Sequence, residues 1–147
     1  AKVHQQTMYV PGTVGGKMSK SRGNLINLFQ PDKKLRKPIM GIVTDSTPME
    51  DPKDPSKDNV FALYKLLAPQ VKVEEMSANY LAGNYGYGHA KQALYELIVE
   101  KFEEPREKFE YYMNHKNEVD EALAFGAEKA RKVADKVLAR VREKLGY

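Results

Sequence analysis

The sequence contains no cysteine, only three histidines and no long hydrophobic run. The absence of cysteine excludes a disulfide framework and a thiolate metal site, and it is typical of proteins that work in a reducing, cytoplasmic setting. His4, His89 and His115 are scattered along the chain, so no metal site is predicted. No stretch approaches the roughly 20 apolar residues of a membrane-spanning helix. We therefore expect no membrane partner.

The composition is that of a soluble globular protein. Of the 147 residues, 41% are hydrophobic and 30% are charged, which suits one domain of ordinary size or a small domain with an attached piece. Positive charge lies at both ends: residues 1–46 hold eight Lys and Arg against two Asp and Glu, and residues 129–147 hold seven against two. Residues 89–128 are acidic instead, with ten Asp and Glu against five Lys and Arg. We expect the basic N-terminal segment to meet an anionic ligand.

Apolar residues recur at helical spacing after residue 30, which predicts a mainly α fold with a helical bundle. The last helix is expected to bury its apolar stripe in that bundle, with Gly126 at the joint before it and Gly146 just beyond its end. The expected helices cover residues 31–43 with a kink or late start at Pro38, 59–67, 72–82, 90–113 with a bend near Pro105, 119–125 and 130–145.

The remaining segments are predicted as strand or loop. VHQQTMYV, residues 3–10, favours a short strand that stops at the Pro-Gly pair after it. Residues 44–58 carry three prolines among seven charged residues, which indicates a surface connection, and Asp58 or Asn59 is expected to cap the next helix. GNYGYGH, residues 83–89, interrupts the helical pattern.

A basic, glycine-flanked stretch, GGKMSKSRGN at residues 15–24, is the feature most indicative of function. Lys17 and Lys20 offer mobile positive charges, while Ser19, Ser21 and exposed backbone amides offer further hydrogen-bond donors. Such groups suit a polyphosphate whose negative charge grows as a bond breaks. The flanking glycines allow the loop to close over a ligand and reopen.

KMSKS, residues Lys17, Met18, Ser19, Lys20 and Ser21, matches letter for letter the second signature of class I aminoacyl-tRNA synthetases. Asn24 also falls where many members have asparagine. The resemblance implies that these five residues form a lid that binds ATP and pyrophosphate. It implies that Lys20 stabilises the leaving pyrophosphate during amino-acid adenylation, and that Lys17 and the serines assist.

Four further stretches resemble the tryptophanyl-tRNA synthetase family, and together they cover nearly the whole chain. The most discriminating parts of this resemblance are VTDS at 43–46 and the YGxxK pattern of Tyr87, Gly88 and Lys91. The stretches are PDKKLRKPIMGIVTDST at 31–47, DNVFALYKLLA at 58–68, GNYGYGHAKQALYELIVEKFEEPREKF at 83–109 and FGAEKARKVADKVLARVREKLG at 125–146.

The first signature of class I synthetases, HIGH or a near variant, does not occur in the sequence, nor does the repeated strand-helix pattern of their nucleotide-binding domain. The chain therefore resembles the carboxyl-terminal third or so of the family. Residues 1–30 would be the end of the Rossmann-like catalytic domain with the lid loop, and residues 31–147 the helical anticodon-binding domain. By itself the chain is expected not to make the adenylate.

The resemblance implies the substrates and partners of the intact enzyme. They are tryptophan, ATP with Mg²⁺ and tRNA(Trp), with no tightly bound cofactor, and the full-length protein would be a homodimer. Candidate tRNA contacts are Tyr87 and Lys91 at the GNYGYGH junction, because aromatic rings beside basic groups hold unpaired bases. Lys132 and Arg140 on the last helix are expected to aid them, as is Lys136.

Several alternatives remain open on the sequence. The GNYGYGH stretch has a plainer interpretation as a helix-helix turn with packed tyrosines. The chain could belong to a tyrosyl-tRNA synthetase, which shares the loop but not this helical tail. It could also be a non-catalytic helical RNA-binding module or a dimerising bundle, although neither needs an intact KMSKS.

Overall fold

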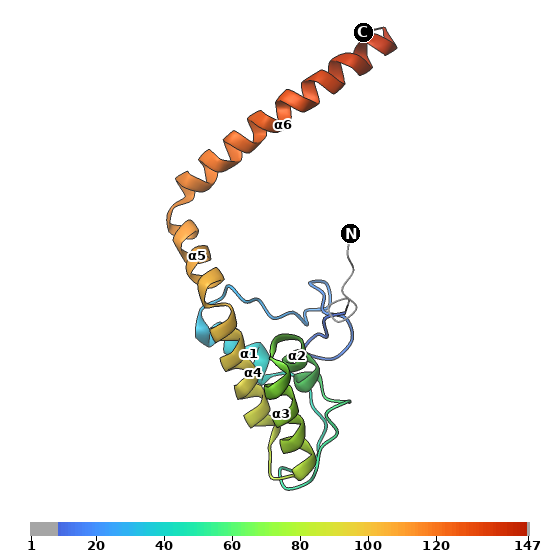
Figure 1. The fold of residues 1–147 in the computed structure, drawn as a ribbon, viewed down its shortest axis with the longest axis vertical. Helices are drawn as coiled ribbons and strands as arrows, with labels where there is room; N and C mark the ends of the chain where they lie inside the picture. The colour runs from blue at the N-terminus through green and yellow to red at the C-terminus, as the bar shows by residue number, and fades with distance from the viewer. Residues whose placement is uncertain (1–8, 147) are drawn as a thin grey trace. The chain divides into compact units, whose positions relative to one another are not determined.

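The computed structural model describes residues 9–146. These residues contain no β-strand, and a single antiparallel bridge joins Pro11 to Lys17. The expected mainly α fold is confirmed (Figure 1). The expected strand at residues 3–10 lies outside the described part except for its last two residues, which are irregular. The helices are α1 (Asp32–Met40), α2 (Asn59–Leu67), α3 (Gln70–Ala82), α4 (Tyr87–Lys101), α5 (Glu103–Asn114) and α6 (Lys116–Leu145).

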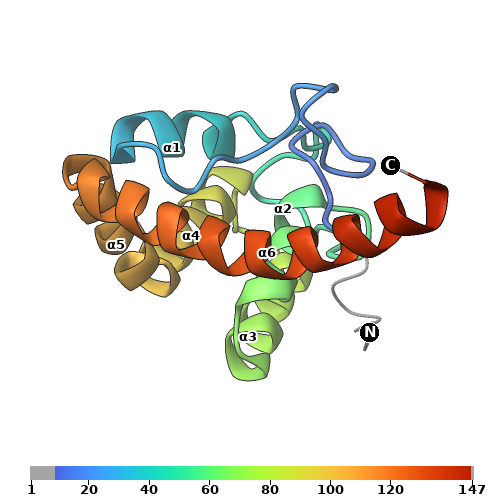
Figure 2. The same ribbon diagram turned by 90° about the horizontal axis from the view of Figure 1, so that it is seen from above.

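The chain divides into two compact units, Ala1–Arg106 and Glu107–Tyr147. In the first unit α4 packs against α1 and α2, and α2 also packs against α3 (Figures 1 and 2). Their apolar stripes meet in one core, as the helical periodicity predicted. The buried side chains are Leu35, Ile39, Ile42, Val60, Phe61, Leu63, Tyr64, Val73, Met76, Tyr80, Ala90, Leu94, Leu97 and Ile98.

Helix α2 begins and ends where the sequence indicated. The Asp58 carboxylate caps it by accepting the backbone amide of Phe61 at 2.7 Å, and the same oxygen accepts the hydroxyl of buried Tyr80 at 2.9 Å. Helix α2 ends before Pro69, as expected. Helix α3 begins at Gln70, directly after this proline, and so two residues earlier than the expected residue 72. A single buried carboxylate thus joins the first turn of α2 to the last turn of α3.

Helix α1 is shorter than predicted. It ends at Met40 rather than at residue 43, because the amide of Gly41 bonds back to Lys37 while the amide of Val43 donates to the carbonyl of Thr13 at 2.8 Å. A tertiary hydrogen bond therefore replaces the next helical one. Pro38 lies inside α1, and Ile42 beyond its end is still buried.

The connection between α3 and α4 needs a glycine for space as well as for conformation. Gly83 has a φ of +77°, and a Cβ there would lie 2.4 Å from the carbonyl oxygen of Glu50. The close approach lets Asn84 donate its amide to that carbonyl at 3.2 Å. Helix α4 then begins at Tyr87, inside the stretch expected to be irregular.

The single long helix predicted for residues 90–113 is wrong. The structure has two helices that are interrupted at Phe102, so Pro105 is the third residue of α5 rather than a bend within one helix. Proline has no amide to donate to the carbonyl of Lys101, and it is tolerated in a first turn where no such bond is needed. The break therefore falls just before that turn.

The predicted pair of helices at 119–125 and 130–145 is also wrong, because α6 runs without interruption through Gly126. Glycine costs roughly 1 kcal/mol in a helix interior, and the alanines at 122, 124, 127 and 130 offset it. The expected αL cap is present at Gly146.

No residue of α5 or α6 is buried, so the prediction that the last apolar stripe is core is not met within the described residues. None of the helices described here has the length and apolar character needed to cross a membrane.

Candidate lid loop and nucleotide-facing site

Residues 10–18 form a tight reversal of the chain. The amide of Met18 donates to the carbonyl of Val10 at 2.8 Å, and the amide of Gly12 donates to Gly16 at 2.9 Å. Gly15 and Gly16 have φ values of +78° and +67°, a conformation that glycine adopts at little cost. The glycines before the signature are thus required by the turn itself.

The signature residues alternate between solvent and core. Lys17 and Lys20 are exposed, whereas Met18 between them is half-buried and packs against the core of the first unit. The hydroxyls of Ser19 and Ser21 lie 2.9 Å apart. Both ammonium groups are therefore presented outward from a backbone that the methionine anchors.

Asn24 is buried, with 1% of its surface exposed, and its amide bonds to the loop three times. Its Oδ1 accepts the amide of Ser19 at 2.8 Å. Its Nδ2 donates to the carbonyls of Lys17 at 3.2 Å and Gly15 at 3.4 Å. Sequence reasoning noted Asn24 only as a position shared with synthetases. A polar residue followed at once by the apolar pair Leu25 and Ile26 was the signal available.

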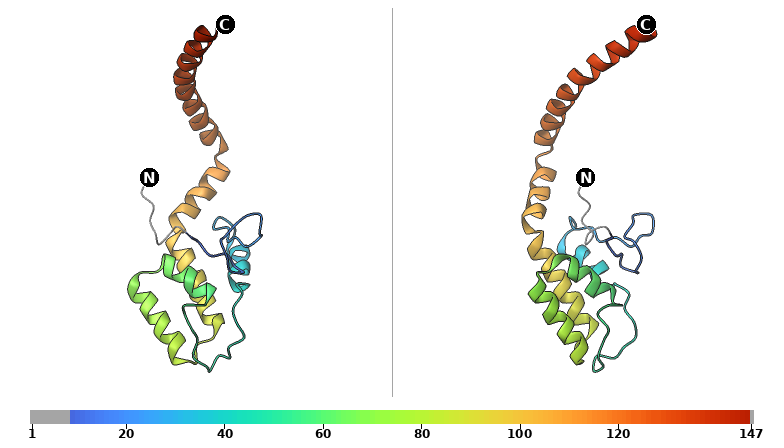
Figure 3. Two further views of the ribbon diagram at one scale, coloured as in Figure 1. Left: turned by 90° about the vertical axis from the view of Figure 1, so that its right-hand side faces the viewer. Right: turned by 45° about the vertical axis from the view of Figure 1, so that its right-hand side comes forward.

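The loop is joined to the helices through two backbone bonds and one side chain. Thr13 donates its amide to the carbonyl of Asn24 at 3.0 Å and accepts the amide of Val43. Asn59, the first residue of α2, donates its side-chain amide to the carbonyl of Val43 at 3.0 Å. The loop accordingly lies where α2 begins (Figure 3, dark blue).

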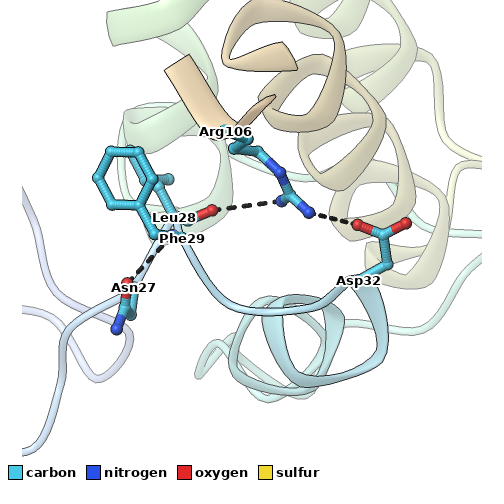
Figure 4. Close-up of polar contacts among 5 residues, drawn as sticks. All are labelled: Asn27, Leu28, Phe29, Asp32 and Arg106. Carbon is cyan, nitrogen blue, oxygen red and sulfur yellow. Dashed lines mark hydrogen bonds and ion pairs between the residues drawn. The ribbon is translucent and has the colours of Figure 1, made fainter. Parts of the chain in front are cut away.

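The segment after the loop is held by Arg106, as Figure 4 shows. Its guanidinium donates to the carbonyl of Leu28 at 3.3 Å and forms an ion pair with Asp32 in the first turn of α1. The Asn27 side chain also accepts the amide of Phe29 at 3.1 Å. The Arg106 side chain is only 17% exposed, although that of Asp32 is 64% exposed, so solvent screens this ion pair less than a pair of fully exposed side chains.

Tyr87, a predicted tRNA contact, already has partners within the fold. Its hydroxyl donates to Asp45 at 2.7 Å, its ring meets that of Tyr80 edge-on at 6.1 Å, and the Lys53 ammonium lies 5.4 Å from the ring centre. Burial and the bond to Asp45 raise the pKa of Tyr87 to about 12. The bond from Tyr87 in turn lowers the pKa of Asp45. The ring is half-buried.

The other predicted tRNA contacts lie on two helices. Lys91 is half-buried on α4, four residues and so about one turn after Tyr87. Lys132 and Arg140 are exposed on α6, in the second unit, and Lys132 pairs with Glu128 at 2.8 Å. The structure thus places the first two candidates on one helix face, and their role in RNA binding stays a prediction.

Lys53 was missed by sequence reasoning, which assigned its whole segment to the surface. It is 3% exposed, and its ammonium donates to the carbonyls of Pro48, Met49 and Asp51 at 2.7, 3.2 and 3.0 Å. One cation thereby satisfies three backbone acceptors and fixes the loop that carries Asp45 toward Tyr87. Charged residues are seldom buried, so composition pointed the other way.

An open pocket of about 240 Å³ lies among α2, α3 and α4. Lys72 and Glu100 form an ion pair across it at 3.8 Å, and the other charges at its rim are carboxylates. That rim disfavours a phosphate backbone. Among residues 9–146 no group of three or more His, Cys, Asp and Glu side chains is placed to hold a metal ion. The pocket is lined by Tyr64, Lys72, Glu75, Met76, Asn79, Tyr85, Ala93, Glu96, Leu97 and Glu100.

An outward-facing KMSKS loop on a helical unit defines a class I synthetase, and comparison with known proteins agrees. The family model of class I tRNA synthetases (W and Y) matches residues 2–103, so the chain belongs to this family. A tryptophan-tRNA ligase of Rhodopirellula baltica is 50% identical over 137 residues, which are 93% of this chain and 43% of the relative. One from Campylobacter jejuni is 42% identical over 146 residues, or 99% of this chain and 46% of the relative.

A solved structure gives the same result. The crystal structure of tryptophanyl-tRNA synthetase from Campylobacter jejuni complexed with ADP and tryptophan matches with a TM-score of 0.93 at 42% identity, over 99% of this chain and 46% of that one. The chain spans less than half the length of these relatives and corresponds to their carboxyl-terminal part. The relatives are tryptophan enzymes, which favours the tryptophan branch of the family over the tyrosine branch.

Proposed function

We propose that this chain is the carboxyl-terminal part of a tryptophan-tRNA ligase and that it supplies the lid over ATP. In the intact enzyme the tryptophan carboxylate attacks the α-phosphorus of ATP, the bond to the β-phosphate oxygen breaks, and tryptophanyl adenylate and pyrophosphate form. A terminal ribose hydroxyl of tRNA(Trp) then attacks the carbonyl carbon of the adenylate, the ester to tRNA forms, and AMP leaves. Residues 1–30 are the C-terminal end of the catalytic domain and carry the KMSKS loop, and residues 31–147 form the helical anticodon-binding domain.

The observation that carries the proposal is the outward presentation of Lys17 and Lys20. Both lysines are exposed and stand on either side of the anchored Met18. In this role the Lys20 ammonium stabilises the charge that grows on the departing pyrophosphate, and Lys17 and the hydroxyls of Ser19 and Ser21 assist. Mg²⁺ accompanies ATP and is held by its phosphates, since this ion is bound through few protein ligands.

The expected test of the lid is Lys20→Ala in the complete protein that contains this chain. Tryptophan-dependent exchange between ATP and pyrophosphate should slow by roughly 10²–10³-fold in kcat, the loss expected for one preorganised donor. Lys33→Ala, which removes another exposed lysine just beyond the loop, is the matched control and should leave the rate unchanged. An undiminished kcat in Lys20→Ala would remove Lys20 from this role.

The helical part is proposed to bind the anticodon loop through Tyr87 and Lys91, with Lys132, Lys136 and Arg140 contributing charge. The half-buried Tyr87 ring, with Lys91 one turn along the same helix, suits an unpaired base better than a duplex. Lys91→Glu should weaken tRNA(Trp) binding without slowing adenylation, and equal affinity in the variant would contradict the assignment.

We further place the full-length enzyme in the cytoplasm as a homodimer, as for the family.

A further inference from the structure

The buried amide of Asn24 forms a clasp across the signature loop. One side chain accepts the Ser19 amide at 2.8 Å and donates to the carbonyls of Lys17 at 3.2 Å and Gly15 at 3.4 Å. A buried polar group costs free energy unless its hydrogen bonds are satisfied. This one is satisfied almost wholly by loop backbone, so its burial and the loop's shape depend on each other.

Gly12 completes the clasp by leaving room for it. A Cβ at residue 12 would lie 2.1 Å from Nδ2 and 2.4 Å from Cγ of Asn24. Gly12 is itself buried, and its amide donates to the carbonyl of Gly16 at 2.9 Å. Glycine is therefore required at this position by the Asn24 side chain. Residues 12 and 24 form a matched pair, twelve residues apart.

The clasp fixes the backbone on both sides of Met18 and so fixes where the lysines project. The bonded carbonyl belongs to Lys17 itself, and the bonded amide is that of Ser19, the residue before Lys20. Asn24 is buried while both lysines are exposed. Asn24 therefore contacts the loop, and the two lysines are the side chains that can contact a ligand.

We infer that Asn24 is a positioning residue for adenylation: its amide, seated over Gly12, holds the Lys17–Ser21 loop in the shape that directs Lys17 and Lys20 at the phosphates. The inference rests on the proposed function of the loop. An amide is needed because it donates and accepts at once. Aspartate has the same shape but would turn two donors into acceptors that face carbonyls.

The first measurement is independent of catalysis. The measurement uses the 147-residue chain and limited digestion with trypsin. Cleavage after Lys57 is the internal reference. Asn24→Ala and Asn24→Asp should each raise the rate of cleavage after Lys17 and Lys20 several-fold, because the loop opens more often. Gly12→Ala should do the same by displacing the asparagine. Unchanged cleavage at the loop in all three variants would overturn the clasp.

The second measurement is a double-mutant cycle in the complete protein, read by ATP-pyrophosphate exchange. Asn24→Ala should lower kcat about 10- to 100-fold, the scale of misplacing a reacting group, and leave the KM for tryptophan unchanged. Added to a variant that already carries both Lys17→Ala and Lys20→Ala, it should cost less than about threefold more, because it acts through those two lysines. Full multiplication of the two effects would show a separate structural role and overturn the inference.

The cycle also separates this inference from the proposed function. If Lys20→Ala leaves exchange intact, the proposed lid role fails. If Lys20→Ala slows exchange while Asn24→Asp, the variant of the same shape, keeps the normal kcat, only the positioning role of Asn24 fails.

Discussion

Helices α4 and α6 carry similar apolar stripes and have opposite environments. On α4 the residues Ala90, Leu94, Leu97 and Ile98 are between 0% and 7% exposed. On α6 the stripe is 43% to 68% exposed, and no residue of the helix is buried. A hydrophobic period of 3.6 residues therefore identifies which face of a helix is apolar, but it does not identify what covers that face. The α6 stripe consists of Val133, Val137, Leu138, Val141 and Leu145.

The two helices are also stabilised by different means. Helix α4 is supported by packing against α1 and α2, and by the bonds from Arg36 to Gln92 at 3.0 and 3.3 Å. Helix α6 depends on local terms, such as the Glu128–Lys132 pair and the αL cap at Gly146. Such terms contribute only tenths of a kcal/mol to about one each. We therefore expect α6 to respond to helix propensity and α4 to respond to packing.

The largest expected effect is the loss of a core side chain from α4. Leu94→Ala should lower the free energy of unfolding of the chain by about 2–5 kcal/mol, because it leaves a cavity beside α1 and α2. Leu138→Ala is the matched control on α6, and it should change stability by less than about 0.5 kcal/mol. Urea unfolding followed by circular dichroism measures both. Similar losses in the two variants would mean that the α6 stripe is buried in solution.

Asp58→Ala comes next, because this carboxylate caps α2 and pairs with buried Tyr80. The expected loss is about 1–3 kcal/mol, since an N-cap is removed and a buried hydroxyl loses its acceptor. The other carboxylate oxygen, Oδ2, is buried without a hydrogen-bond partner, which holds the loss toward the lower end. Thermal unfolding measures it, with exposed Asp54→Ala as the control. An equal shift in the control would contradict the role of the cap.

Gly126→Ala should have a smaller effect of the opposite sign. A Cβ at this position meets no atom within 4 Å, and replacing glycine by alanine inside a helix stabilises by about 0.5–1 kcal/mol. The helical signal of α6 should persist to higher temperature. Gly83→Ala is the contrast, because the same substitution there meets the Glu50 carbonyl and should destabilise. A destabilised Gly126→Ala variant would show that α6 is covered at that turn.

The smallest expected effect is a pH dependence at the Tyr87–Asp45 bond. The pKa of Asp45 is lowered in the folded chain, so the bond contributes stability above the ordinary aspartate pKa and loses it as the pH falls through the lowered value. The pKa of Tyr87 is raised to about 12, so the contribution is also lost above the ordinary tyrosine pKa. Tyr87→Phe should be less stable than the original chain between about pH 5 and 9 and approach it in acid. A constant difference down to pH 2 would contradict this.

Local sequence signals located several features correctly because a few neighbouring residues determine them. Asp58 followed by an apolar period predicted the start of α2, and Pro69 predicted its end. Gly146 predicted the αL cap. The KMSKS match indicated the family, which the family model over residues 2–103 confirms. At each helix end the deciding interaction lies within about one helical turn of the residue that signals it.

Signals failed where distant residues compete for the same groups. Val43 was expected to continue α1, but its amide bonds to Thr13. Lys53 was expected at the surface, but three carbonyls enclose its ammonium. The role of Asn24 depends on Gly12, twelve residues earlier. Thr13 and Gly12 lie outside any local window around Val43 and Asn24. The carbonyls around Lys53, in contrast, come from residues two to five positions earlier, and only the folded loop turns them toward the ammonium.

The family and the mainly α character can be read from neighbouring residues, since a signature and a hydrophobic period are both local patterns. The fit between Asn24 and Gly12 and the burial of α4 against α1 and α2 follow only from the fold of the first unit. The physical reason is that burial and hydrogen-bond pairing are settled between segments, because a buried polar group must find whichever partner the folded chain brings near it.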